Sequence, residues 1–311
     1  MEELEIVPQH QIDGMRVFVN TVEYRSPHFH PEWELLWVQD SPLNITSSQK
    51  KYEILPGELI LFPPNWPHEF HEMEQPCTFL CLQISSRAFP STVHLHTDEI
   101  RLVSCLSEAD DRWLRQAMLE TARVCFSQEP YSELFCLGQC GLILHRLLRA
   151  VPCHTMSAEE LARTEQRNAR LARLIRFVDE NFTHKIRLAD FAQSEGCTLS
   201  FLSRFVRDAM NQTFQDYVNS VRFNCARKLI VLTEKPMVDI CYESGFSDYR
   251  YFSRSFREAY GMTPAEYRLR AQAAPAEQLR SESLHSREKI YSREESLRQL
   301  ETFRRSIETQ A

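Results

Sequence analysis

Residues 203–217 read SRFVRDAMNQTFQDY, and residues 253–267 read SRSFREAYGMTPAEY. Serine, arginine, alanine, threonine, acidic and tyrosine positions recur in the second stretch with an offset of fifty residues. Self-similarity at a fixed offset indicates that one small structural unit has been built twice. The rest of the chain can be understood outward from this pair.

Each copy follows a short apolar helix pattern and a glycine. The apolar residues at helical spacing are Leu188, Phe191 and Ala192 before Gly196, and Val238, Ile240 and Cys241 before Gly245. Thr198 and Ser247 are candidate N-caps for the helix that comes next. Helix, glycine turn and helix make a helix-turn-helix, whose second helix meets base edges in DNA. Two helical hairpins packed only for stability are the alternative.

The segment between the two units is predicted to be one helix over residues 213–232. Thr213 can cap it, and Pro236 prevents its continuation. Its apolar stripe consists of Phe214, Tyr217, Val218, Val221, Cys225, Ala226, Leu229 and Leu232. About twenty residues at ~1.5 Å each span ~30 Å, which approaches the ~34 Å turn of B-DNA. One chain is therefore expected to read two adjacent half-sites in successive major grooves of double-stranded DNA.

The second unit carries a family resemblance. Residues 245–248 read GFSD, 251–254 read YFSR, and 261–268 read GMTPAEYR. These motifs, with the helix over residues 222–232, resemble the signature of the AraC/XylS family of bacterial transcription regulators. The resemblance covers about the last hundred residues before the C-terminal tail. It implies DNA binding, contact with RNA polymerase, a homodimer, and activation rather than repression.

The base-reading candidates come from two predicted recognition helices, over residues 199–210 and 248–260. Leu202, Phe205, Phe252 and Phe256 are expected to face the core. The outward positions that match the motif are Ser200, Ser203, Arg204, Tyr249, Arg250, Ser253 and Arg254, with Arg207 and Arg257 nearer the phosphates. Arginine suits a bidentate contact with guanine, and Arg254 is the strongest candidate because Arg204 repeats it. A solvated role for any single arginine is the alternative.

Charge separates the chain into two halves. Residues 1–150 hold 11 Lys and Arg against 21 Asp and Glu, whereas residues 165–270 hold 17 against 13. Only the second half suits a polyanion such as DNA. The 311 residues predict an effector-binding and dimerisation domain over 1–150, a linker over 151–166, a DNA-binding domain over 167–270 whose first helix starts at Asn168, and a charged tail over 271–311. The tail is expected to be solvated, and docking is the alternative.

Cysteine usage and hydropathy indicate the compartment. The ten cysteines are scattered without metal-knuckle spacing, which predicts reduced core residues. No early apolar run is long enough for a signal peptide or a membrane span. We expect a cytoplasmic protein that does not contact a membrane.

The N-terminal half has the pattern of a β-barrel followed by helices. Residues 15–20, 34–38 and 59–62 are short β-prone runs between turn residues, which favours a sandwich or barrel. Residues 108–150 then show helical apolar spacing in two stretches, with a break at Pro130 between them. These helices are expected to cover the barrel or to pair with a second copy. The fold class is therefore α+β multidomain, with a cupin-like jelly-roll barrel and a C-terminal all-α domain.

Two motifs in the predicted barrel resemble the cupin motifs. Residues 28–34 read HFHPEWE, and residues 57–68 read GELILFPPNWPH, with Asn65 where enzyme-type cupins often have glycine. Even spacing places His28, His30 and Glu34 on one face of a strand, and His68 completes the set.

We considered two interpretations of this set. The favoured one is a metal-free effector pocket formed by His28, His30, Glu34, Trp66 and His68, which binds a small molecule with a carbohydrate as the leading class. The alternative is a divalent metal held by His28, His30, Glu34 and His68, because imidazole and carboxylate suit Zn, Fe, Mn or Ni. That alternative would make the protein a metal-dependent cupin enzyme fused to a DNA-binding module, whereas the favoured interpretation assigns no catalytic residue and no cofactor.

Overall fold

The computed structural model describes residues 11–47, 50–71, 75–92, 94–98, 100–210, 212–273 and 286–309. The chain divides into two compact units, Met1–Glu165 with Glu288–Ala311, and Gln166–Arg287. Asn211 of the repeat and residues 274–285 of the predicted tail lie outside the described residues. No helix within the described ranges is long and apolar enough to cross a membrane.

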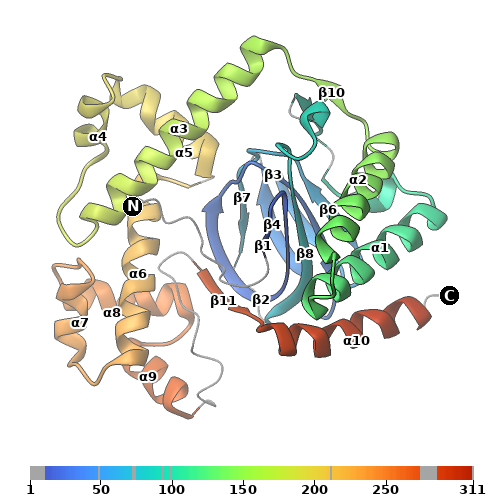
Figure 1. Cartoon of the computed structure of the whole chain (residues 1–311). Coiled ribbons are helices and arrows are strands. Elements are labelled where there is room, and N and C mark those ends of the chain that lie inside the picture. Colours follow the sequence, from blue (N-terminus) through green and yellow to red (C-terminus); the bar gives the residue numbers. More distant parts are fainter. Residues whose placement is uncertain are drawn as a thin grey trace. The chain divides into compact units, whose positions relative to one another are not determined.

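The first unit is built on antiparallel strands (Figure 1). Its strands are β1 (Gln11–Ile12), β2 (Met15–His28), β3 (Glu32–Val38), β4 (Leu43–Ser47), β5 (Lys50–Ile54), β6 (Leu59–Phe62), β7 (His68–Phe70), β8 (Cys77–Ser85), β9 (Leu95–His96), β10 (His154–Thr155) and β11 (Ser286–Ile290). Two 3₁₀ turns, η1 (Pro90–Thr92) and η2 (Leu102–Ser104), follow β8 and β9.

Helices complete the first unit and form the second. They are α1 (Glu108–Ser127), α2 (Ser132–Ala150), α3 (Ala158–Asn181), α4 (Leu188–Ser194), α5 (Leu199–Met210), α6 (Phe214–Leu232), α7 (Met237–Glu243), α8 (Tyr249–Tyr260), α9 (Pro264–Ala273) and α10 (Arg293–Thr309). The predicted barrel followed by helices, and the predicted all-α second unit, are confirmed.

The strand order is β5-β4-β7-β2-β8-β3-β6, with β1 and β11 also paired to β2. The long strand β2 stands in the middle of this order, between β7 and β8, and joins its two halves. Its first part, from Met15 to Val22, pairs with β8, and its last part, from Arg25 to His28, pairs with β7. The register shifts between Arg25 and His28, and such a shift bends a strand locally. The sheet therefore forms a near-closed antiparallel barrel.

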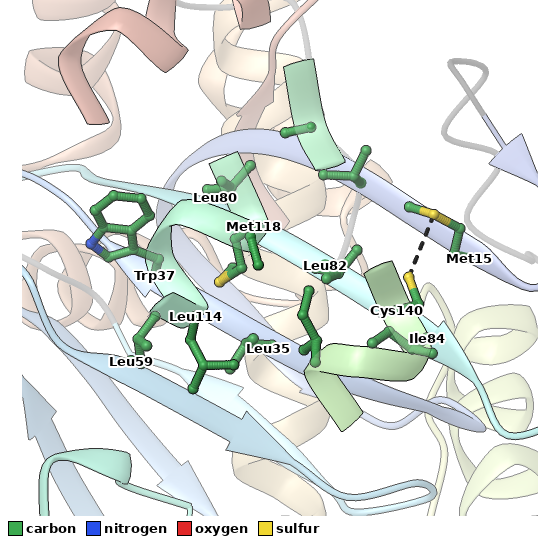
Figure 2. Packing of buried hydrophobic residues seen from close by; sticks show 14 of the residues in the cluster. Met15, Leu35, Trp37, Leu59, Leu80, Leu82, Ile84, Leu114, Met118 and Cys140 are labelled. Atoms are coloured by element: carbon green, nitrogen blue, oxygen red, sulfur yellow. Dashed lines mark hydrogen bonds between the residues drawn. The ribbon is translucent and has the colours of Figure 1, made fainter. Parts of the chain in front are cut away.

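Both faces of the central strands are buried, which explains their nearly continuous apolar sequence. In β3, Leu36 and Val38 lie in the apolar cluster inside the barrel, whereas Trp33, Leu35 and Trp37 lie in the cluster under the helices. Figure 2 shows this second cluster, in which Leu35, Trp37, Leu80 and Leu82 meet Leu114 and Met118 of α1. Since side chains alternate along a strand, Glu34 faces the barrel interior.

Helices α1, α2 and α10 cover that outer face of the sheet (Figure 1). Ser107 caps α1 by accepting a hydrogen bond from the Asp110 backbone N–H, and α2 begins after the predicted break at Pro130. Trp33 points away from the barrel interior, because it lies in the cluster under the helices. Its side chain is 1% exposed beneath the helices, so it is a core residue and cannot stack on a ligand from solvent.

The predicted linker is mostly helical. Helix α3 begins at Ala158 and continues without interruption to Asn181, through the boundary between Glu165 and Gln166. We predicted a linker over residues 151–166 and a helix that starts at Asn168. Ser157 explains the earlier start, because its hydroxyl accepts from the Glu160 backbone N–H and the Glu160 carboxylate accepts from the Ser157 N–H.

The prediction of a charged, solvated tail over 271–311 is wrong for its described part. Strand β11 pairs with β2, and α10 packs against α1. Leu300 and Phe303 are buried in the cluster under the helices, and the Phe303 and Trp37 rings lie 4.9 Å apart. Arg293 donates to the carbonyls of Phe126 and Ser127 at the end of α1. Docking, the alternative that the sequence left open, is therefore what the structure shows for residues 286–309, and few apolar residues carry it.

Replacing Phe303 with Ala should destabilise the first unit by about 3–5 kcal/mol, since it removes a fully buried aromatic ring. All four tryptophans lie in residues 33–113, so urea unfolding followed by tryptophan fluorescence reports on this unit. Arg304→Ala, on the exposed side of α10, is the matched control. An unchanged midpoint for Phe303→Ala would show that α10 is not docked.

Candidate functional site

The first helix-turn-helix consists of α4 and α5. Gly196 forms the turn with a φ of +62°, a left-handed conformation that favours glycine. Thr198 accepts a hydrogen bond from the Phe201 N–H, as predicted for a cap. Leu202 and Phe205 are buried, so the opposite face of α5 is free for another molecule.

Glu195, at the end of α4, fixes this unit to α3. Its carboxylate accepts from Arg173 at 2.6 Å and 2.8 Å and from Arg170 at 3.2 Å. The hydrogen bond from Arg173 is the main reason that the pKa of Glu195 is lowered. This ion-pair network sets the position of the turn that leads into α5.

The second helix-turn-helix consists of α7 and α8. Gly245 has a φ of +88°, and a Cβ atom there would lie 2.4 Å from the Phe182 carbonyl oxygen, so no other residue fits without movement. Asp248, and not the predicted Ser247, caps α8 through the Tyr251 N–H. Phe252 and Phe256 are fully buried in an aromatic cluster. The two units therefore share one design, as the repeat predicted.

Helix α6 connects the two units over the predicted range. Thr213 and Asp216 form a reciprocal capping box at its start. Arg222 donates to the carbonyls of Phe182 and His184, while Arg268 donates to carbonyls at the helix end, including that of Ile230. Leu232 is 60% exposed, so the predicted apolar stripe ends before it. The capping box and the hydrogen bonds of Arg222 and Arg268 therefore make α6 a fixed spacer.

The side chains predicted to contact DNA lie on α5 and α8. Ser200, Arg204, Arg207, Arg250, Arg254 and Arg257 are exposed, and Ser203, Tyr249 and Ser253 are partly buried. Arg254 keeps 70% of its side-chain surface, with Glu258 at 4.0 Å and the Tyr251 ring beneath it. An arginine held this loosely remains available to a ligand. These positions give α5 and α8 each a polar, arginine-containing face.

Inside the barrel, three residues of the predicted set form a compact buried group. His30 Nε2 lies 2.5 Å and His68 Nε2 lies 3.3 Å from the same oxygen of Glu34. His30, Glu34 and His68 each offer a ligand atom within 4.8 Å of one another, and they are the group of this kind found among the described residues. His28 lies outside it, although its ring centroid is 4.1 Å from that of His68.

The residues reach this group from separate elements. We predicted that His28, His30 and Glu34 share one strand. Instead His28 ends β2, His30 lies in the turn, and Glu34 lies in β3. His68 opens β7 and pairs with His28 across the strands, and its ring stacks on Phe62 at 4.0 Å. His28 and His68 therefore lie on paired neighbouring strands, and the prediction that His28, His30 and Glu34 share one strand is wrong.

Backbone carbonyls orient all three imidazoles. The Nδ1 atoms of His28, His30 and His68 lie 2.9, 3.2 and 2.9 Å from the carbonyl oxygens of Ser26, Glu32 and Trp66. Each Nδ1–H thus donates to the main chain, which directs each Nε2 toward the interior. Such outer hydrogen bonds fix the tautomer and ring orientation of ligating histidines.

We call His28, His30, Glu34 and His68 the histidine cluster. The pKa shifts divide it into a charged pair, His30 and Glu34, and two neutral imidazoles, His28 and His68. Burial disfavours charge on His30, but the Glu34 carboxylate outweighs it and raises the pKa of His30. Burial likewise opposes ionisation of Glu34, yet His30 holds its pKa well below the ordinary value. Burial lowers the pKa of His28 and of His68. Neutral His68 then turns a lone pair toward an anionic oxygen, and no aligned partner for its Nε2 exists among the described residues.

Trp66 and Asn65 stand beside the cluster. Trp66 is partly buried and lies against His96, with ring centroids 4.4 Å apart. Asn65 has a φ of +60°, which explains why glycine is common at this position in the resembling motif. No sequence motif predicted a role for Cys81, whose thiol donates to the second Glu34 oxygen at 3.2 Å. Cys81 lies in β8, 47 positions after Glu34 in the sequence, so no local pattern links the two residues.

Comparison with protein families assigns both units. The model of the AraC-like ligand binding domain matches residues 16–120, and a helix-turn-helix domain model matches residues 191–270. The match therefore covers the barrel with α1, and the paired helix-turn-helix units.

Individual relatives agree with this assignment. SoxS from Escherichia coli K12, a regulatory protein, is 32% identical over 97 residues, which cover 31% of this chain and 91% of SoxS. YbfI from Bacillus subtilis 168, an uncharacterised transcriptional regulator, is 22% identical over 79% of this chain and 87% of its own length. RhaS from Mannheimia succiniciproducens, a transcriptional activator, is 27% identical, and the match spans 46% of its length. A structure of ToxT from Vibrio cholerae O395 covers 84% of this chain and 100% of ToxT, with 16% identity and a TM-score of 0.41.

Glu195→Gln should destabilise the second unit by about 1–2 kcal/mol at pH 7, a value that allows for the half-exposed Arg173. Because folding lowers the pKa of Glu195 from its ordinary 4.5, its contribution is complete above pH 4.5 and disappears as the pH falls through the lowered value. Helical circular dichroism during urea unfolding measures it, with the exposed Glu180→Gln as control. A difference from wild type that persists undiminished at pH 3 would contradict the ion-pair account.

Proposed function

Because the chain belongs to the AraC family of transcription regulators, we propose that it reads DNA with α5 and α8 and that a small molecule bound in the barrel regulates this activity. The observation that carries the proposal is the repeated polar face, one on each recognition helix, held by the capped helix α6. The ligand-binding domain and the helix-turn-helix domain are family assignments. The residues, the ligand and the direction of regulation are proposals.

Each helix is assigned the same task. The first turn of α5, with Ser200, Ser203 and Arg204, contacts bases in one major groove. The first turn of α8, with Arg250 and Arg254, contacts bases in the next. Arg207 and Arg257 lie one turn further along their helices and neutralise phosphates. Arginine and serine donors suit the acceptor-rich base edges of this groove.

Arg254→Ala should weaken binding to the preferred duplex by about 1–3 kcal/mol and relax selection at one base-pair position. The measurement is selection from a random duplex library with the full chain, followed by titration at fixed salt. Arg257→Ala is the matched control, and it should weaken all duplexes alike and reduce the salt dependence. If Arg254→Ala also weakens all duplexes alike, then Arg254 contacts phosphate.

The barrel cluster is proposed as the effector site. Buried imidazole and carboxylate groups can exchange hydrogen bonds with hydroxyl groups, and Trp66 supplies a flat apolar surface, so a carbohydrate is the leading class. Activation is supported by the similarity to RhaS, which is a transcriptional activator. We further propose that the protein acts in the cytoplasm as a homodimer, for which Leu134 and Leu142 on α2, 72% and 54% exposed, supply an apolar surface, and that it contacts RNA polymerase.

Metal sensing is a second candidate. The specific observation in its favour is the approach of two lone-pair atoms, His68 Nε2 and a Glu34 oxygen, to 3.3 Å. A cation or a hydrogen-bond donor between them would remove the repulsion. With His30 displaced from its ion pair, two imidazoles and one carboxylate would hold a divalent ion such as Zn²⁺. When bound, such an ion supplies charge that organises the site.

Metal sensing predicts about one Zn²⁺ per chain after purification without chelator, and a rise in unfolding temperature on adding Zn²⁺. Glu34→Gln and His30→Ala should each abolish both effects, whereas His71→Ala, near the cluster in sequence but outside it, should not. Elemental analysis and thermal shift decide this. Stabilisation by a sugar panel without bound metal would instead support the effector proposal, and metal-dependent turnover would favour the enzyme.

A further inference from the structure

The C-terminal strand contributes to the interior of the barrel. Ile290 packs against the apolar cluster inside the barrel, whereas Tyr291 packs against the cluster under the helices. Because side chains alternate along a strand, Glu288 faces the interior together with Ile290. The interior therefore includes side chains that lie far beyond the matched ligand-binding domain, which ends at residue 120.

Glu288 binds two side chains of β2. Its carboxylate accepts from Asn20 Nδ2 at 2.5 Å and lies 3.5 Å from an Arg25 nitrogen. Asn20 is fully buried, and the Glu288 and Arg25 side chains are 5% and 13% exposed. Asn20 Oδ1 is buried without a hydrogen-bond partner among the residues that the structure describes, so this group can accept from a bound molecule.

Arg25 joins this group to the histidine cluster. It lies three residues before His28, at the register shift of β2. Arg25 stands opposite Phe70 of β7, and the Phe70 ring lies 5.7 Å from the rings of both His28 and His68, so the positive charge of Arg25 lies beside the cluster. Glu288 neutralises part of that charge. Removing the Glu288 carboxylate would leave Arg25 nearly buried, without this partner, and close to two imidazoles.

The Glu288 contact lies directly beside the boundary between the two units. The DNA-binding unit ends at Arg287, and Glu288 is the next residue. The unit is thus attached to the barrel unit at both ends, through the continuous helix α3 and through β11. Glu288 binds Arg25, and one peptide bond joins Glu288 to Arg287. A movement of β2 at Arg25 therefore reaches the last residue of the DNA-binding unit through Glu288.

We propose that Glu288 is a positioning residue of the effector site, which holds Arg25 and Asn20 of β2 and transmits the state of the histidine cluster to the DNA-binding unit. This inference rests on the proposed function. It assigns the C-terminal segment a role in the response, beyond the stability that α10 provides.

A double-mutant cycle on the full chain tests the proposal without a known effector. Glu34→Gln perturbs the cluster, and the readout is the dissociation constant for the duplex selected from the random library. We expect Glu34→Gln to change that constant at least about fivefold, the lower end of common allosteric coupling. In the Glu288→Gln background the change should fall below about twofold. Glu288→Gln keeps an oxygen for Asn20 and removes the charge that faces Arg25.

Controls separate positioning from stability. Glu58→Gln removes another carboxylate of the same unit, which pairs with Arg101 at 2.5 Å, and should leave the fivefold effect intact. Arg25→Gln should reproduce Glu288→Gln and replaces it if that variant does not fold. An equal effect of Glu34→Gln in both backgrounds, or no effect in either, overturns the inference. Failure of the wild-type chain to select any duplex would instead overturn the proposed function.

Discussion

The fixed spacing of two recognition helices is the constraint on which the DNA-binding account depends. Helix α6 runs from Phe214 to Leu232, a length of about 28 Å at ~1.5 Å per residue. A spacer of this length is useful only if it does not fray or bend. The capping box at Thr213 holds the start of the helix, and Arg222 holds its middle through a hydrogen bond to the Phe182 carbonyl. Arg268 holds its end through the Ile230 carbonyl. Neither helix-turn-helix unit alone fixes the distance to the other.

A different constraint organises the barrel. Its central strands are buried on both faces. Successive side chains along each strand therefore point alternately into the barrel interior and toward the covering helices. One polar residue in the sequence of β3, Glu34, is thereby enclosed in the interior. An enclosed carboxylate must be paired or neutralised, and His30 provides the pair. Because this ion pair between His30 and Glu34 is buried, any molecule that binds Glu34 in the barrel interior must alter it.

Much of this arrangement could be predicted from the sequence. The offset repeat and the glycines Gly196 and Gly245 identified both helix-turn-helix units, because the turn geometry depends on local residues. Helix α5 begins and ends where predicted, since its apolar spacing is strong. The histidine motif identified His30, Glu34 and His68 as neighbours. It placed His30 on the same strand as Glu34, whereas His30 lies in the turn before that strand.

The rest depended on contacts that no local pattern records. The docking of α10 rests on a few buried side chains, chiefly Phe303 against Trp37, in a segment of balanced charge. Likewise, Glu288 and Asn20 are separated by 268 positions, and neither stands in a motif. The long helix α3 was cut short in the prediction because its first turns are polar and exposed, which resembles a linker. Tertiary packing and chain return, not propensity, decide these regions.

The central claim is that one chain places two helices in successive major grooves on one face of DNA. Hydroxyl-radical footprinting of the full chain on its selected duplex measures this directly. The account predicts two protected patches whose centres lie about one helical turn, or ~10 base pairs, apart on the same face. A single protected patch, or two patches on opposite faces of the duplex, would contradict it.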